Sequence, residues 1–146
     1  MSNESFRDVF LKKVISDYNN HLSLEKNLQG KLDSMTKIRM HNTVEYRRLF
    51  EIKTEQSYFV SYLIRIINHI SSKDEAFLLD FSNKKSLIKG IVNTWKKNDI
   101  KGMRKRRKEL GDKTIDLMKK LIGNSVSKVE NYLDFLEQEM KGVKWN

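Results

Sequence analysis

The chain of 146 residues contains no proline. Average usage is about 5%, so roughly seven prolines are expected in a chain of this length. Sandwiches and loop-rich enzymes rely on proline in their turns, whereas helices joined by short links do not need it. The missing proline therefore favours an all-α fold, and the length suits one domain with a real core.

Apolar residues recur at the three- and four-residue spacing of amphipathic helices along most of the chain. Asn3 and Ser5 are both candidate caps for a first helix, whose apolar stripe runs from Phe6 to Leu22. This stripe can pack within the chain or pair across a two-fold axis in a homodimer, and both alternatives stay open. The run at 57–70 is the most apolar, which is typical of a helix at the centre of a bundle.

Turn and cap residues predict where the helices begin and end. A break is expected near Gly30, and 72–75 has the spacing of a capping box that opens a short helix ending at Ser82 and Asn83. A helix over 84–97 follows, and 98–109 forms either another short helix or its continuation. Gly111 and Gly123 bracket one more helix. We therefore predict that residues 1–146 form a single domain, a compact bundle of about six to eight helices with a central apolar helix near 57–70.

The charge is unevenly distributed along the chain. Residues 84–128 hold 15 basic and 4 acidic side chains, whereas 1–83 hold 12 basic and 11 acidic ones. The formal net charge of the whole chain is +10. About a third of the sequence therefore carries the whole excess, which indicates an anionic partner for that segment.

The excess is densest in 96–108, where eight of thirteen residues are Lys or Arg, opposed only by Asp99. Such an array suits nucleic-acid phosphates, because neutralising several of them releases condensed counterions. The predicted phosphate contacts are Lys96, Lys97, Lys101, Arg104, Lys105, Arg106, Arg107 and Lys108. DNA is favoured over RNA as the partner. The alternatives are a solvated helix face, a membrane surface and an acidic protein surface.

A helix-turn-helix can be drawn over 73–97, with 84–97 as the helix that enters a groove. Lys84 would extend its polar face, and the candidates for base-edge contacts are Lys85, Lys89 and Asn93. The stretch 85–100 is similar in pattern to the recognition helix of winged-helix repressors of the MarR type. It lacks a turn glycine and wing strands, so we do not assign the chain to that family.

Nothing in the sequence supports an enzyme. There is no phosphate-binding or dinucleotide-binding glycine motif, no cysteine, and no closely spaced histidine pair, so neither a cofactor nor a metal is expected. No segment is apolar enough to span a membrane, and the N-terminus lacks the order of a signal peptide. We expect a cytoplasmic protein, associated with the nucleoid or nucleus if it binds DNA. Its function is predicted to be regulatory or accessory nucleic-acid binding; the alternative is a helical adaptor or inhibitor that docks an acidic protein.

Overall fold

A computed structural model describes residues 5–141 of the chain, and the predicted all-α fold is confirmed over that range. It contains six helices and no strand there. The helices are α1 (Phe6–Lys37), α2 (Val44–Ser71), α3 (Glu75–Leu79), α4 (Phe81–Lys105), α5 (Arg107–Leu110) and α6 (Asp112–Lys141).

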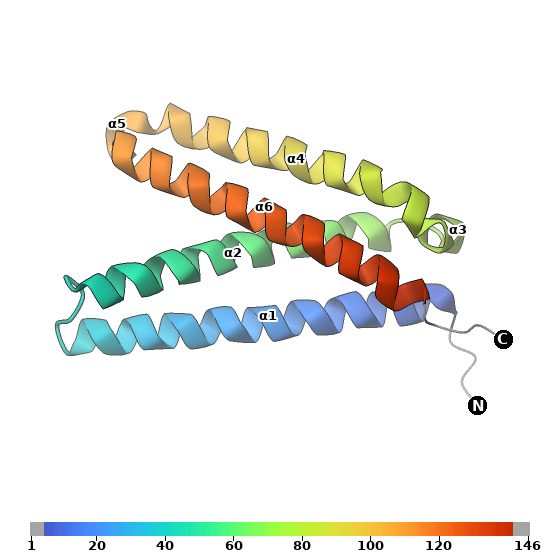
Figure 1. The fold of residues 1–146 in the computed structure, drawn as a ribbon, viewed down its shortest axis with the longest axis horizontal. Helices are drawn as coiled ribbons and strands as arrows, with labels where there is room; N and C mark the ends of the chain where they lie inside the picture. Colours follow the sequence, from blue (N-terminus) through green and yellow to red (C-terminus); the bar gives the residue numbers. More distant parts are fainter. Residues whose placement is uncertain (1–4, 142–146) are drawn as a thin grey trace.

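The four long helices form two antiparallel hairpins (Figure 1). The first hairpin is made by α1 and α2, and the second by α4 and α6 with the short α5 at its tip. α6 packs against both α2 and α4, while α3 links the hairpins at the opposite end of the molecule. The loop between α1 and α2 and the tip at α5 lie at the same end of the long axis but on separate hairpins (Figure 1).

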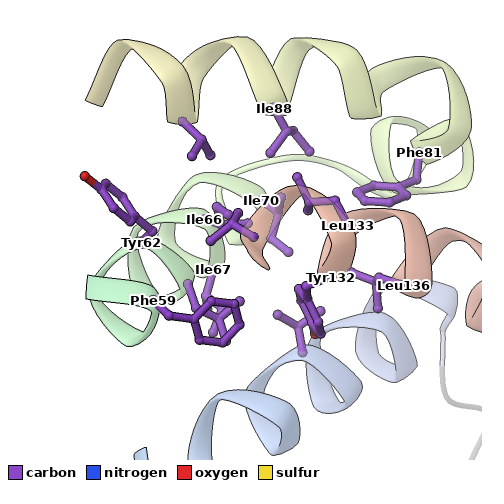
Figure 2. Close-up of a cluster of buried hydrophobic side chains, with 14 of the residues drawn as sticks. Phe59, Tyr62, Ile66, Ile67, Ile70, Phe81, Ile88, Tyr132, Leu133 and Leu136 are labelled. Atoms are coloured by element: carbon purple, nitrogen blue, oxygen red, sulfur yellow. The ribbon is translucent and has the colours of Figure 1, made fainter. Parts of the chain in front are cut away.

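One cluster of buried apolar side chains joins the two hairpins. Figure 2 shows Ile88 of α4 and Leu133 of α6 directed toward Ile66 and Ile70 of α2. The predicted central run supplies much of this core, because its helix buries side chains on most of its faces. Phe6, Phe10 and Val14 of the predicted N-terminal stripe are buried in this core and so pack within the chain.

Polar contacts fix α6 against the first hairpin. The Tyr132 hydroxyl donates to Asp17 Oδ2 at 2.8 Å, and the Ser125 hydroxyl donates to the carbonyl of Glu55 at 2.9 Å. Burial and the hydrogen bond to Asp17 raise the pKa of Tyr132, so its hydroxyl stays protonated. These bonds set the register of α6 along α1 and α2.

Several predicted helix ends are confirmed and others are wrong. Ser5 caps α1, and Asn3, the other candidate, lies outside the described residues. Gly111 separates α5 from α6 with a φ of 82°, a conformation that favours glycine. The breaks expected at Gly30 and Gly123 are wrong, because α1 and α6 run through them. A helix packed along one whole face tolerates the cost of an interior glycine, about 1 kcal/mol relative to alanine.

The connection before α4 also differs from the expectation. Asp74, and not Ser72, caps α3, since its side chain accepts a hydrogen bond from the amide of Phe77 at 2.9 Å. The turn expected at Ser82 and Asn83 lies inside the first turn of α4, which begins at Phe81. No helix of the described residues is long and apolar enough to cross a membrane.

Candidate nucleic-acid interface

The basic cluster, defined here as the eight cations of 96–108, occupies the C-terminal half of α4, the corner after it and α5. Gly102 does not break α4, which continues to Lys105. The amide of the capping residue, Arg106, donates to the carbonyl of Met103 at 2.9 Å. The cluster therefore wraps around the tip of the second hairpin (Figure 1). Seven of its eight side chains are exposed, and Lys96 is half-buried.

The one carboxylate within 96–108 is directed away from the cluster. Asp99 Oδ2 accepts hydrogen bonds from the Tyr62 hydroxyl at 2.8 Å and from the Arg65 guanidinium at 3.2 Å, both on α2. Burial and this carboxylate raise the pKa of Tyr62, which keeps the donor protonated. Because Asp99 is bound to Tyr62 and Arg65 of α2, it forms no ion pair with a cation of the cluster.

A groove between α4 and α6 brings a further cation to the cluster. It has a volume of about 450 Å³ and is lined by Lys97, Ile100, Lys101, Arg104 and Lys119, with no carboxylate among them. Lys119 belongs to α6 and was not among the predicted site residues. Its only signal in the sequence is the turn at Gly111, which folds α6 back along α4 and so places the two basic segments side by side.

Only two cations of the cluster form ion pairs within the described residues. Arg106 Nε lies 3.2 Å from Glu109 Oε2, and Arg107 Nε lies 3.2 Å from Asp112 Oδ1. All four side chains are more than 60% exposed, so water and salt screen both pairs. An incoming phosphate can therefore compete for these arginines at little cost.

The N-terminal half of α4 has a different surface. Lys85 Nζ lies 2.8 Å from Asp134 Oδ1 and 2.6 Å from Glu137 Oε2, and Lys89 Nζ lies 2.9 Å from the same oxygen of Asp134. Hydrogen bonds from the Lys85 ammonium lower the pKa of both Asp134 and Glu137. These contacts hold α4 against α6, and they leave both lysines engaged within the protein.

The remaining predicted residues of that half lie outside the basic cluster. The Asn93 side-chain amide donates to the carbonyl of Lys89 at 2.9 Å, within α4. Lys84 Nζ lies 6.0 Å from the centre of the Phe77 ring. The segment 73–97 does not form the short helix 73–81, the turn at 82–83 and the helix 84–97 drawn for a helix-turn-helix. Its first helix, α3, has only five residues, and the predicted turn lies inside α4.

Residues 5–141 contain no group of three or more His, Asp or Glu side chains that could hold a metal ion. Compared with protein-family models, curated proteins and solved structures, the chain gives no significant match. Its function therefore has to be inferred from its own residues.

Proposed function

We propose that the protein binds nucleic acid through the basic cluster together with Lys119, and that it acts by binding rather than by catalysis. The observation that carries this proposal is a concentration of exposed cations at one tip. Asp99 is turned toward α2, and the neighbouring carboxylates Glu109 and Asp112 pair with only two of the eight cations. Placing so many like charges together lowers stability through repulsion. A polyanion offsets that repulsion, so the arrangement fits a binding surface better than a merely solvated one.

Phosphate contact is the mechanism that this surface supports. The groove that Lys97, Lys101, Arg104 and Lys119 line offers cations from two helices, so it can contact phosphates on either side of the α4–α6 seam. Such contacts supply sequence-independent affinity through counterion release. The apolar residues of the segment, Ile100 and Met103, pack toward the core, so base stacking is not part of the proposal.

The test is fluorescence anisotropy of the full chain with labelled double-stranded DNA, single-stranded DNA and RNA, at about 50 and about 200 mM salt. Four or so phosphate contacts lower the affinity by about a hundredfold over that range. DNA is the expected preferred ligand. Absence of binding at the lower salt contradicts the proposal and favours the alternative, an adaptor or inhibitor that docks an acidic protein.

A charge-reversal variant tests the location of the surface. Arg104→Glu/Arg106→Glu/Arg107→Glu should lower nucleic-acid affinity by at least about a hundredfold at 50 mM salt. The control, Lys26→Glu/Lys31→Glu/Lys53→Glu, changes the net charge equally on the first hairpin. Equal losses in the two variants would assign binding to overall charge and contradict a local site.

A further inference from the structure

The tip of the first hairpin, defined here as residues 37–48, exposes aliphatic side chains to solvent. Ile38 is 66% exposed and Val44 is 72% exposed, and Met40 between them is 38% exposed. Within residues 5–141, three of the ten exposed large hydrophobic residues lie in the hairpin tip, and two more, Phe50 and Ile52, follow it in α2. Single exposed apolar residues are ordinary, but such a local concentration indicates an interaction surface.

The backbone of this hairpin tip is held in a defined shape. The amide of Met40 donates to the carbonyl of Met35 at 2.8 Å, and the amide of Arg39 donates to the carbonyl of Thr36 at 3.1 Å. These are the two hydrogen bonds of a Schellman motif. Arg39 has a φ of 60°, a left-handed conformation that glycine adopts at lower energetic cost. Thr43 then caps α2 by accepting from the amide of Tyr46. An arginine thus stands at a position where glycine is the usual residue.

Four cations lie close in sequence to the exposed aliphatic residues of the hairpin tip. Lys37, Arg39, Arg47 and Arg48 are all exposed, against the single carboxylate of Glu45. Within the described residues, no ion pair or side-chain hydrogen bond engages any of these four cations. The hairpin tip therefore combines a positive surface with a protruding apolar one.

This combination separates the hairpin tip from the basic cluster. In 96–108, Ile100 is only 8% exposed and no large hydrophobic side chain is exposed. Nucleic-acid phosphates need only the cations, whereas an exposed aliphatic side chain gains by leaving water for hydrocarbon. A second copy of the chain would bring its own four cations to the contact, which disfavours self-association there.

We propose that the hairpin tip docks on the surface of an anionic lipid bilayer. Ile38 and Val44 enter the boundary between headgroups and acyl chains, and the four cations contact lipid phosphates and carboxylates. The proposal concerns a different surface and a different ligand from the basic cluster, so it stands or falls independently of nucleic-acid binding.

The test is co-sedimentation of the full chain with vesicles at about 100 mM salt, where screening leaves only close charge contacts. One set is pure phosphatidylcholine, and the other contains about 30% phosphatidylserine to supply the negative surface potential. We expect binding to the anionic vesicles at least about tenfold stronger than to the neutral ones.

The discriminating variant is Ile38→Ser/Val44→Ser, because it removes apolar surface and leaves the net charge unchanged. It should weaken binding to the anionic vesicles by at least about tenfold, since two aliphatic side chains no longer enter the bilayer. The matched control is Leu79→Ser/Leu87→Ser, which removes two leucines that are 60% and 58% exposed on α3 and α4. That control should bind as the wild type does, and circular dichroism checks the fold of both variants.

Three outcomes overturn the proposal. One is that the wild type does not bind anionic vesicles, and another is that both double variants bind them equally well. The third is that Ile38→Ser/Val44→Ser weakens nucleic-acid binding but not vesicle binding, which would make the hairpin tip a second nucleic-acid contact.

Discussion

Both halves of α4 carry lysines, but the lysines have different surroundings in each half. In the N-terminal half, Lys85 and Lys89 face Asp134 and Glu137 of α6 and are engaged in ion pairs. In the C-terminal half, Lys119 of α6 lines the same groove as Lys97, Lys101 and Arg104, so these cations lie near another cation. The charge of the side chains on α6 therefore determines the role of a lysine on α4. A lysine that faces a carboxylate stabilises the helix contact, and one that faces another cation remains available for a ligand.

We call the N-terminal half of α4 the anchored half and its C-terminal half the exposed half. The largest expected effect on stability comes from a substitution in the anchored half. Ile88 is 1% exposed in the core between α4, α2 and α6, so Ile88→Ala should lower the free energy of unfolding by about 2–5 kcal/mol. In the exposed half, Arg104→Ala should change it by no more than about 0.5 kcal/mol. Urea unfolding monitored by circular dichroism measures both. A comparable loss of unfolding free energy in the two variants would contradict the difference described here between the two halves.

The next effect separates the lysines of the two halves. Lys85→Met leaves Asp134 and Glu137 without their shared partner, so the Tm should fall by a few degrees, whereas Lys101→Met should leave it almost unchanged. For nucleic-acid affinity we expect the reverse, with a loss only in Lys101→Met.

The pH dependence of the Tm of Lys85→Met tests whether the ion pairs of the anchored half stabilise the protein. Asp134 and Glu137 have lowered pKa values, so their stabilising contribution is present near neutral pH and is lost as the pH falls below about 4. Part of that loss should be missing in Lys85→Met. An identical acid dependence of Tm in the variant and the wild type would show that the network contributes nothing.

A smaller pH effect should appear between pH 7.5 and 5.5. Burial lowers the pKa of His21, with a further lowering by Lys128 that Asp17 opposes. Because the folded pKa lies below the ordinary 6.5, the unfolded chain binds more protons, and stability falls as the pH drops through about 6.5. Tm should decrease over this range in the wild type and less in His21→Gln. Nucleic-acid binding through lysine and arginine, which stay charged, should depend less on pH there.

The smallest effect comes from the two glycines of α4, one in each half. A Cβ at Gly90 or Gly102 meets no heavy atom within 4 Å, so alanine fits at both positions. Either substitution should stabilise the protein by about 0.5–1 kcal/mol through helix propensity. Neither should alter nucleic-acid affinity. A loss of affinity confined to Gly102→Ala would mean that the exposed half changes shape on binding.

Periodicity and capping residues were sufficient to predict the helical class and several boundaries. The apolar run at 57–70 and the Ser5 cap depend on local chemistry, so they could be identified from spacing alone. The uninterrupted lengths of α1 and α6 could not, because Gly30 and Gly123 are stop signals in isolation. Long apolar faces packed against neighbouring helices outweigh the cost of an interior glycine.

The composition of the candidate site was also predictable, but its geometry was not. The density of cations in 96–108 can be read directly from the sequence. The direction of Asp99 toward α2, the pairing of Lys85 with α6 and the approach of Lys119 are long-range contacts. Sequence spacing alone does not fix contacts between helices that are distant in the chain.

The most direct test of the account is the salt dependence of DNA affinity in two matched variants. Lys97→Gln/Lys101→Gln/Arg104→Gln removes cations from the exposed half, and Lys85→Gln/Lys89→Gln removes them from the anchored half. We predict that the slope of log affinity against log salt falls by about 2 to 3 in the first variant and stays at the wild-type value in the second. An unchanged slope in the first variant, or an equal loss per cation in both, would contradict the assignment of binding to the exposed half of α4.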